Sequence, residues 1–129
     1  SRRRGRAPEP TPVLQRGELE QLFGLVERVF LPTEVAEALG RLVEYTHPST
    51  SPVKKVQDYV RYGASPRAAI GLAEAVRVHA LMFGKPNVGL EDVRALAPNV
   101  LGHRMALDYR AKLDGVTVWE LIDEVVNAL

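Results

Sequence analysis

Apolar residues recur at helical spacing along most of the chain. Between Glu18 and Phe30 they follow one another at intervals of three and four residues, which is the pattern of an amphipathic helix. Stripes of the same kind predict further helices. One follows Pro32, and the others cover residues 53–62, 65–83, 89–97 and 117–129. The chain is therefore predicted to be all-α, a small bundle of five to six helices.

Two segments leave the pattern less clear. Residues 100–113 fit either a strand, through the alternation of Met105 and Leu107, or a helix. Pro98 is expected to end the helix that precedes this segment. Val88 and Val116 each stand just before a predicted helix, and one short β-bridge between them fits the pattern.

The ends of two helices carry specific signals. Ser65 is a good N-cap residue, because its hydroxyl can accept a hydrogen bond from a free N–H of the first turn, and Pro66 suits the first helical position. Gly84 stands where a helix that ends at Phe83 needs a C′ residue. Thr117-x-x-Glu120 is a capping box and marks the start of the last helix.

The helix predicted over 65–83 is apolar on most of its circumference, so we expect other elements to enclose it on most sides. Its one polar stripe consists of Arg67, Gly71, Glu74 and Arg77, which indicates that Arg67 points away from the core. His79 lies on the apolar side, and we expect it to be a satisfied core histidine, not a metal ligand.

Arg67 is a cation in the first turn of this helix, at the positive end of the helix dipole. Such a placement costs roughly 0.3–1 kcal/mol. An anion held jointly by the free N–H groups and the guanidinium would reverse the sign of this energy. The sequence therefore predicts an arginine that faces a phosphate.

Composition and charge narrow the class of protein. The 129 residues suit one domain, and the absence of cysteine excludes disulfides and thiolate metal sites. No apolar run approaches the roughly 18 residues that span a bilayer, and no secretory signal is visible, so a cytoplasmic protein is expected. Residues 1–12 carry four arginines against one glutamate, whereas residues 13–129 have a net charge of −2. Residues 1–12 are predicted to be a basic, proline-rich linker, and nucleic acid is not an expected partner.

No catalytic motif is visible in the sequence. A phosphate-binding loop, a nucleophile elbow and a zinc-protease motif are all absent. The neighbouring acids Glu91-Asp92 and Asp123-Glu124 would diverge by about 100° on a helix, so each is expected to compensate a helix dipole or to be solvated. This chain by itself is not expected to be an enzyme.

Several motifs resemble a known family. The segment Val60–Ala68, which contains Gly-Ala-Ser-Pro-Arg-Ala, resembles the signature of the C-terminal helical lid of MoxR-type AAA+ ATPases. The resemblance continues through Val88–Pro98 and Val100–Arg104, and Pro12–Leu14 is similar to the segment that leads into the family's lid. Gly89-Leu90 departs from the Thr-Pro pair more usual in the family. The resemblance covers roughly residues 12–129 and predicts a lid domain over residues 13–129.

The resemblance implies that Arg67 is the sensor-2 arginine, which reaches the γ-phosphate of ATP bound to a neighbouring core domain. It also implies that Gly63, Ala64, Ser65 and Pro66 lie near the nucleotide. Mg-ATP would be held mainly by the core, and the parent would be an ATP hydrolase. The expected task is chaperone-like remodelling or metal-cofactor insertion.

The implied partners are the protein's own AAA+ core, the neighbouring subunits of a hexamer and a protein with a von Willebrand factor A domain. Two alternatives remain open at this point. One is a free-standing helical interaction module, which would bind protein through its last helix or nucleic acid through residues 1–6. The other is the lid of a magnesium-chelatase-type ATPase.

Overall fold

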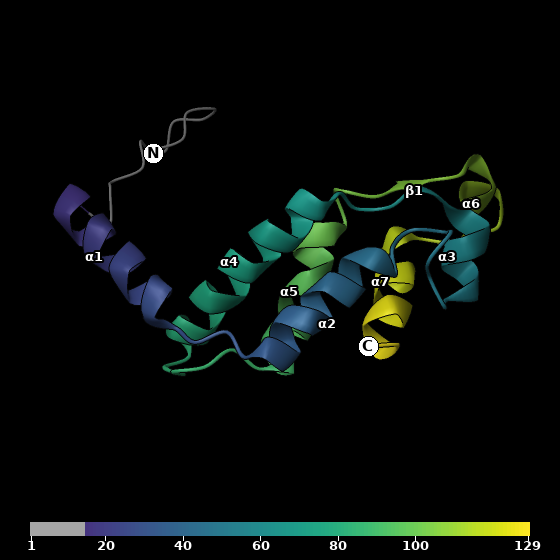
Figure 1. Ribbon diagram of the computed structural model, residues 1–129. Coiled ribbons are helices and arrows are strands. Elements are labelled where there is room, and N and C mark those ends of the chain that lie inside the picture. Colours follow the sequence, from purple (N-terminus) through teal and green to yellow (C-terminus); the bar gives the residue numbers. More distant parts are fainter. Residues whose placement is uncertain (1–14) are drawn as a thin grey trace, which may run out of the picture.

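The computed structural model describes residues 15–129, and the predicted linker over residues 1–12 and the segment Pro12–Leu14 lie outside this range. The described chain forms seven helices and two short strands (Figure 1). The helices are α1 (Arg16–Arg28), α2 (Thr33–Glu44), α3 (Lys54–Tyr59), α4 (Pro66–Met82), α5 (Leu90–Leu101), α6 (Tyr109–Leu113) and α7 (Val118–Asn127). The strands are β1 (Val60–Tyr62) and β2 (Ala106–Leu107). The all-α prediction is confirmed, although the described chain has seven helices where five to six were predicted.

The core lies between α2, α4, α5 and α7, which pack together in the centre of Figure 1. Each of these helices buries one stripe of aliphatic side chains. The fully buried larger residues are Leu42, Leu72, Val76, Val93, Leu101, Leu121, Ile122 and Val125. Truncating such a leucine to alanine typically costs 2–5 kcal/mol, so this cluster is the main source of stability.

Helix α1 differs from the rest of the bundle. None of its residues is buried, and its contacts with other helices are made mainly with α4. The Phe23 side chain of α1 is 57% exposed. The helix is nevertheless amphipathic, as predicted. Beyond its end, Val29 is buried and Phe30 forms a parallel bridge with Asn87, which ties the connection between α1 and α2 to the loop before α5.

The segment over residues 100–113 contains the end of one helix, a strand and another helix. Strand β2 pairs antiparallel with β1, with a bulge between Val60 and Tyr62. The bridge predicted between Val88 and Val116 is not the one that forms, because β1 pairs with β2 and the isolated bridge joins Phe30 to Asn87.

Helix α5 does not end at Pro98, contrary to the prediction. Proline lacks the N–H that would donate to the preceding turn, and its ring crowds the carbonyl four residues before it, but α5 continues to Leu101 with Gly102 N–H bonded to the Pro98 carbonyl at 2.9 Å. The buried stripe Val93, Ala97 and Leu101 explains the continuation, because ending the helix at Pro98 would withdraw Leu101 from the core.

The prediction that α4 is enclosed on most sides is also wrong. Its buried residues, Ala68, Leu72, Val76 and Ala80, form one narrow stripe. Away from this stripe Ile70 is 64% exposed and Met82 is 78% exposed, and the exposed Arg67 and Glu74 lie between them around the helix. The side of α4 away from the core is therefore exposed and carries both apolar and charged side chains.

The helix-end signals hold in three of four cases. Pro66 occupies the start of α4, Gly84 follows its end with φ 69°, and Thr117 and Glu120 form the capping box of α7. The fourth signal, the Ser65 cap, is described below. No described helix is long and apolar enough to cross a membrane.

Candidate functional site

The first turn of α4 presents Arg67 to solvent. Ser65 precedes it in an extended conformation, and Pro66 stands at the first helical position. The prediction for the Ser65 side chain is wrong, because its hydroxyl makes no capping hydrogen bond. The first turn is therefore closed by backbone alone, with Ala68 N–H bonded to the Ser65 carbonyl at 2.9 Å.

No ion pair formed by the described residues includes Arg67. By contrast, Lys55, Lys85 and Arg110 each lie within 3.2 Å of a carboxylate oxygen. An exposed arginine at the positive end of a 17-residue helix has nothing on the described chain that offsets the helix dipole. The predicted outward direction of Arg67 is confirmed, and its contact with a phosphate stays a prediction.

The loop before α4 is held by the end of α2. Ala64 is completely buried, and its N–H donates to the Thr46 hydroxyl at 2.9 Å. Its carbonyl accepts from Nε2 of His47 at 2.7 Å. The Thr46 hydroxyl in turn donates to the Val43 carbonyl at 2.6 Å. We call the side chains of Thr46 and His47 the Ala64 clamp.

Gly63 permits this close approach. A Cβ atom at this position would lie 2.7 Å from the Thr46 carbonyl oxygen and 2.8 Å from Cγ of His47. Both distances are too short for a real side chain, and the first involves backbone that cannot easily yield. The glycine of the Gly-Ala-Ser-Pro-Arg-Ala motif is therefore required for packing against α2.

A shallow depression of about 350 Å³ lies beside the clamp. His47, Pro48 and Ser49 line one part of it, and Arg61, Tyr62 and Gly63 line the other. The Arg61 guanidinium lies 5.4 Å from the centre of the Tyr62 ring, a cation–π contact. The predicted residues Gly63–Arg67 thus adjoin a surface that also carries a second arginine and an exposed aromatic ring.

The opposite end of α4 carries a buried ion cluster. The Asp92 side chain is inaccessible to solvent, and its carboxylate accepts from Nδ1 of His79 at 2.6 Å and from the Gly89 N–H at 2.8 Å. Lys85 Nζ lies 2.7 Å from both Asp92 and Glu91. His79 is therefore a satisfied histidine that links α4 to α5, as predicted.

The charges of this cluster shift one another's pKa. Burial alone would raise the pKa of Asp92, but the hydrogen bonds from Gly89, Lys85 and His79 outweigh burial and hold it below its usual value. The hydrogen bond to Asp92, followed by that to Glu91, raises the pKa of Lys85. Of the four acids predicted to be solvated or dipole-compensating, Asp92 lies in the first turn of α5, where it compensates the dipole, but it is fully buried.

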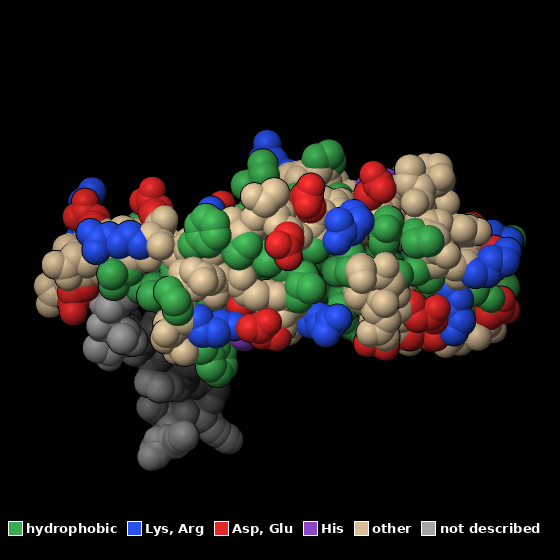
Figure 2. All heavy atoms as spheres, turned by 60° about the horizontal axis from the view of Figure 1, so that its bottom comes forward, with side chains coloured by type: hydrophobic (Ala, Val, Ile, Leu, Met, Phe, Trp, Pro, Cys, Tyr) green, Lys and Arg blue, Asp and Glu red, His purple; other side chains and the backbone are tan. Residues whose placement is uncertain are grey.

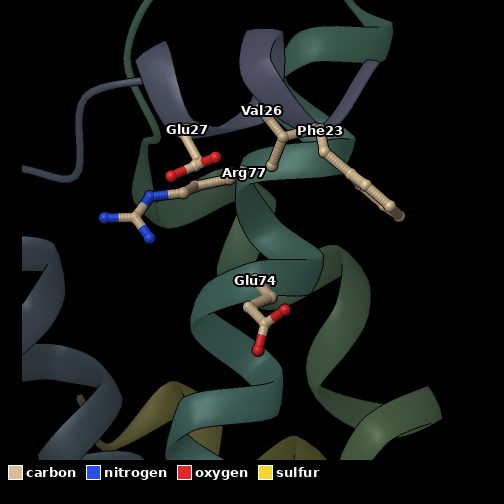
Figure 3. Close-up of a pocket in the computed structure, with 5 residues that line it drawn as sticks. All are labelled: Phe23, Val26, Glu27, Glu74 and Arg77. Atoms are coloured by element: carbon tan, nitrogen blue, oxygen red, sulfur yellow. The ribbon is translucent and has the colours of Figure 1, made fainter. Parts of the chain in front are cut away.

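A pocket of about 520 Å³ lies between α1 and α4 (Figure 3). Phe23, Val26 and Glu27 come from α1, and Glu74 and Arg77 from α4. Figure 3 shows Glu27 and Arg77 on one side of this pocket and the Phe23 ring on the other. Nε of Arg77 is buried and has no hydrogen-bond partner among the described residues.

Apolar side chains reach the surface in several places. Figure 2 shows them between charged residues along much of the face in view. Within residues 15–129, no group of three or more histidine and acidic side chains could hold a metal ion. The exposed apolar side chains by themselves do not specify a small-molecule site.

The comparisons with known proteins identify the family. Residues 54–125 match the family model described as the AAA lid domain. The chain belongs to this family. The match includes β1, the Ala64 loop, Arg67 and the whole of α4 and α5, whereas Thr46 and His47 of the Ala64 clamp lie before it. The predicted resemblance to the C-terminal lid of a MoxR-type AAA+ ATPase is confirmed.

The lid is similar to two curated proteins. It is 31% identical to Chaperone MoxR1 of Mycobacterium tuberculosis over 123 residues, which are 95% of this chain and 33% of that protein. It is 30% identical to the uncharacterised protein YeaC of Bacillus subtilis over 92% of this chain and 34% of that protein. The chain thus spans about a third of the length of these relatives.

A solved structure shares the fold. The crystal structure of a presumed ATPase from Cytophaga hutchinsonii superimposes with a TM-score of 0.83 at 24% identity. The superposition covers 88% of this chain and 34% of the other. The lid arrangement of Figure 1 therefore recurs in a larger protein.

Proposed function

We propose that this lid belongs to an AAA+ ATPase and closes over ATP bound to the core of that protein, with Arg67 contacting the γ-phosphate. The observation that carries the proposal is the exposed Arg67 at the start of α4, which enters no ion pair among residues 15–129. Gly63, Ala64, Ser65 and Pro66 would border the nucleotide, and Mg-ATP would be held mainly by the core.

The chemistry of Arg67 is electrostatic. A guanidinium beside the γ-phosphate stabilises the charge that the phosphoryl oxygens carry during transfer. Its contact also makes the orientation of the lid depend on whether that phosphate is present. The dipole of α4 has the same sign as the guanidinium and adds to its attraction for an anion.

The uncovered face of α4 supports a second part of the proposal. Ile70 and Met82 are mostly exposed on the same helix that carries Arg67. Exposed apolar side chains interspersed with charged ones are common at protein–protein interfaces. We assign this face to contacts with the core or with neighbouring subunits of a hexamer.

The biological task and the partners are proposed on the resemblance. The parent would perform chaperone-like remodelling or metal-cofactor insertion in the cytoplasm, with a protein that carries a von Willebrand factor A domain. The match to a protein named Chaperone MoxR1 favours remodelling. A magnesium-chelatase-type lid and a free-standing interaction module remain the alternatives to this reading.

The test is ATP hydrolysis by the full-length parent with Arg67→Ala. Loss of one group that stabilises transition-state charge is expected to lower kcat by about a hundredfold. Arg94→Ala is the matched control, because Arg94 is also exposed but stands near the start of α5, beside the Asp92 end of the bundle. Arg67→Lys should recover part of the rate, since a lysine restores the charge without the paired N–H groups.

Near-normal hydrolysis by Arg67→Ala would reject the sensor role. A parent gene without a nucleotide-binding core would reject the ATPase lid and favour the free-standing module. For that module, binding of nucleic acid that weakens with salt and disappears on deletion of residues 1–6 is the discriminating result.

A further inference from the structure

We infer that Thr46 and His47 are positioning residues for Arg67, and that the Ala64 clamp sets where its guanidinium lies. This inference rests on the proposed function and extends it to two residues in the turn that follows α2. Neither residue contacts Arg67 directly. Both act through the backbone of Ala64, three residues before it.

The clamp holds the one point of the loop that is anchored in the core. Only residues 63–65 separate β1 from α4, and of these Ala64 alone is buried. A buried peptide group without partners would cost roughly 1–3 kcal/mol for each unpaired atom. Thr46 and His47 satisfy both atoms, so the loop has one favourable position against α2.

The connection from Ala64 to Arg67 is stiff. Ser65 has φ −74° and ψ 160°, the extended conformation that a residue before proline prefers. Pro66 has a φ restricted by its ring, and Arg67 already belongs to the helix. A displacement of Ala64 is therefore transmitted to the start of α4 and is not absorbed by a flexible linker.

The clamp demands specific chemistry at both residues. The Thr46 hydroxyl accepts from Ala64 and donates to Val43, so it needs both functions of a hydroxyl in a site without solvent. A carbonyl only accepts, so Nε2 of His47 must carry the proton in its bond to Ala64. Valine has the shape of threonine but neither function, which makes Thr46→Val a clean probe.

The chain offers a matched control. Thr50 also donates its hydroxyl to a carbonyl near the end of α2, that of Glu44, at 2.7 Å. Its hydroxyl is not part of the Ala64 clamp. Thr50→Val therefore removes a bond of the same kind from the same region without releasing the loop.

The experiment is a double-mutant cycle in the full-length parent. The quantity measured is the rate of single-turnover ATP hydrolysis, in an assay sensitive enough to follow the residual rate of Arg67→Ala. Thr46→Val is expected to lower the rate about 10- to 100-fold, the scale of loss that a misplacement of about 1 Å can cause. The same change in the Arg67→Ala background should cost little more, because the group it positions is gone. Thr46→Ser should restore most of the rate, and Thr50→Val should behave as wild type.

A purely structural role gives a different result. Thr46→Val would then lower the rate by the same factor in both backgrounds, and this outcome overturns the inference. Wild-type rates for both Thr46→Val and His47→Ala, with a slow Arg67→Ala, also overturn it but leave the proposed function standing. If Arg67→Ala itself is fast, the proposed function fails.

Circular dichroism and a thermal melt of each variant establish that it folds. If Thr46→Val does not fold, His47→Ala carries the same cycle, because it removes the bond to the Ala64 carbonyl and leaves the bond from the Ala64 N–H to Thr46 in place. A non-additive loss in that cycle supports the inference, and an additive loss or no loss overturns it.

Discussion

The two ends of α4 are secured by opposite means. At the end near Phe83, His79 and Lys85 both contact the carboxylate of Asp92, which is itself fully buried. At the start, the Ala64 clamp consists of hydrogen bonds to a peptide group, and the one nearby cation on the helix, Arg67, enters no ion pair within the described chain.

The difference separates stability from function on one helix. The contacts of a buried carboxylate with its partners are costly to break, and they leave the charge of that carboxylate unavailable to a ligand. A clamp without ions leaves the charge of Arg67 outside any described ion pair, and we propose that this charge meets a phosphate. The predictions below test this division, from the largest expected effect on stability to the smallest.

Asp92→Ala should be the most destabilising substitution of this comparison. It leaves the Gly89 N–H, His79 and Lys85 without their buried acceptor, and breaking a buried pair in this way costs about 3–5 kcal/mol. Urea unfolding gives the free energy. The exposed Asp123→Ala is the control and should change it by less than about 0.5 kcal/mol; equal effects of the two would contradict the role of the cluster.

Gly63→Ala should destabilise the lid by about 1–3 kcal/mol, because the added methyl group meets the Thr46 carbonyl at 2.7 Å. Gly40→Ala is the matched control within α2. No atom lies within 4 Å of its added Cβ, so it should stabilise the lid by about 0.5–1 kcal/mol. Relative to wild type, the melting temperature should fall for Gly63→Ala and rise for Gly40→Ala. An unchanged melting temperature for Gly63→Ala would mean that the loop does not pack tightly on α2.

The acid sensitivity of the lid should depend on Asp92. Its pKa is lowered in the folded state, so the stability it contributes is fully present above the unfolded value near 3.8. That contribution is lost as the pH falls from there through the lower folded value. Asp92→Asn should therefore be less stable than wild type at pH 7, and the gap should narrow as the pH falls below about 4. A gap that stays constant in urea titrations from pH 7 to pH 2 would show that the carboxylate charge is not what matters.

Arg67→Ala should leave stability nearly unchanged, within about 0.5 kcal/mol, because the side chain is exposed and enters no described ion pair. Removal of an unfavourable charge from the positive end of α4 can even stabilise it slightly. A chemical unfolding curve that shifts by more than 1 kcal/mol would indicate an interaction within the lid. The contrast with the expected loss of hydrolysis is the sharpest test of the division between the two ends.

Local signals predicted much of this molecule from sequence. The helical stripes, Pro66 at the start of α4, Gly84 after its end and the Thr117 capping box all depend on residues within about four positions of each other. The outward direction of Arg67 follows from the same helical spacing. The family motif around Gly63–Ala68 then identified the lid, and the comparisons confirmed it.

The tertiary structure decided what depends on distant partners. The Ser65 hydroxyl makes no cap, and α5 runs through Pro98 because Leu101 is needed in the core. Asp92 is buried by His79, 13 residues away in sequence, although its sequence neighbourhood suggests an ordinary solvated acid.

The sequence by itself thus determined most of the helices, the family and the exposed position of Arg67. Only the tertiary structure brought Thr46 and His47 to Ala64, 18 and 17 residues away. The physical reason is that helix periodicity and capping act over one or two turns of chain. The partners of a buried peptide group, in contrast, are chosen by how whole helices pack. The residue proposed to face the phosphate is visible in the sequence, and the residues proposed to position it are not.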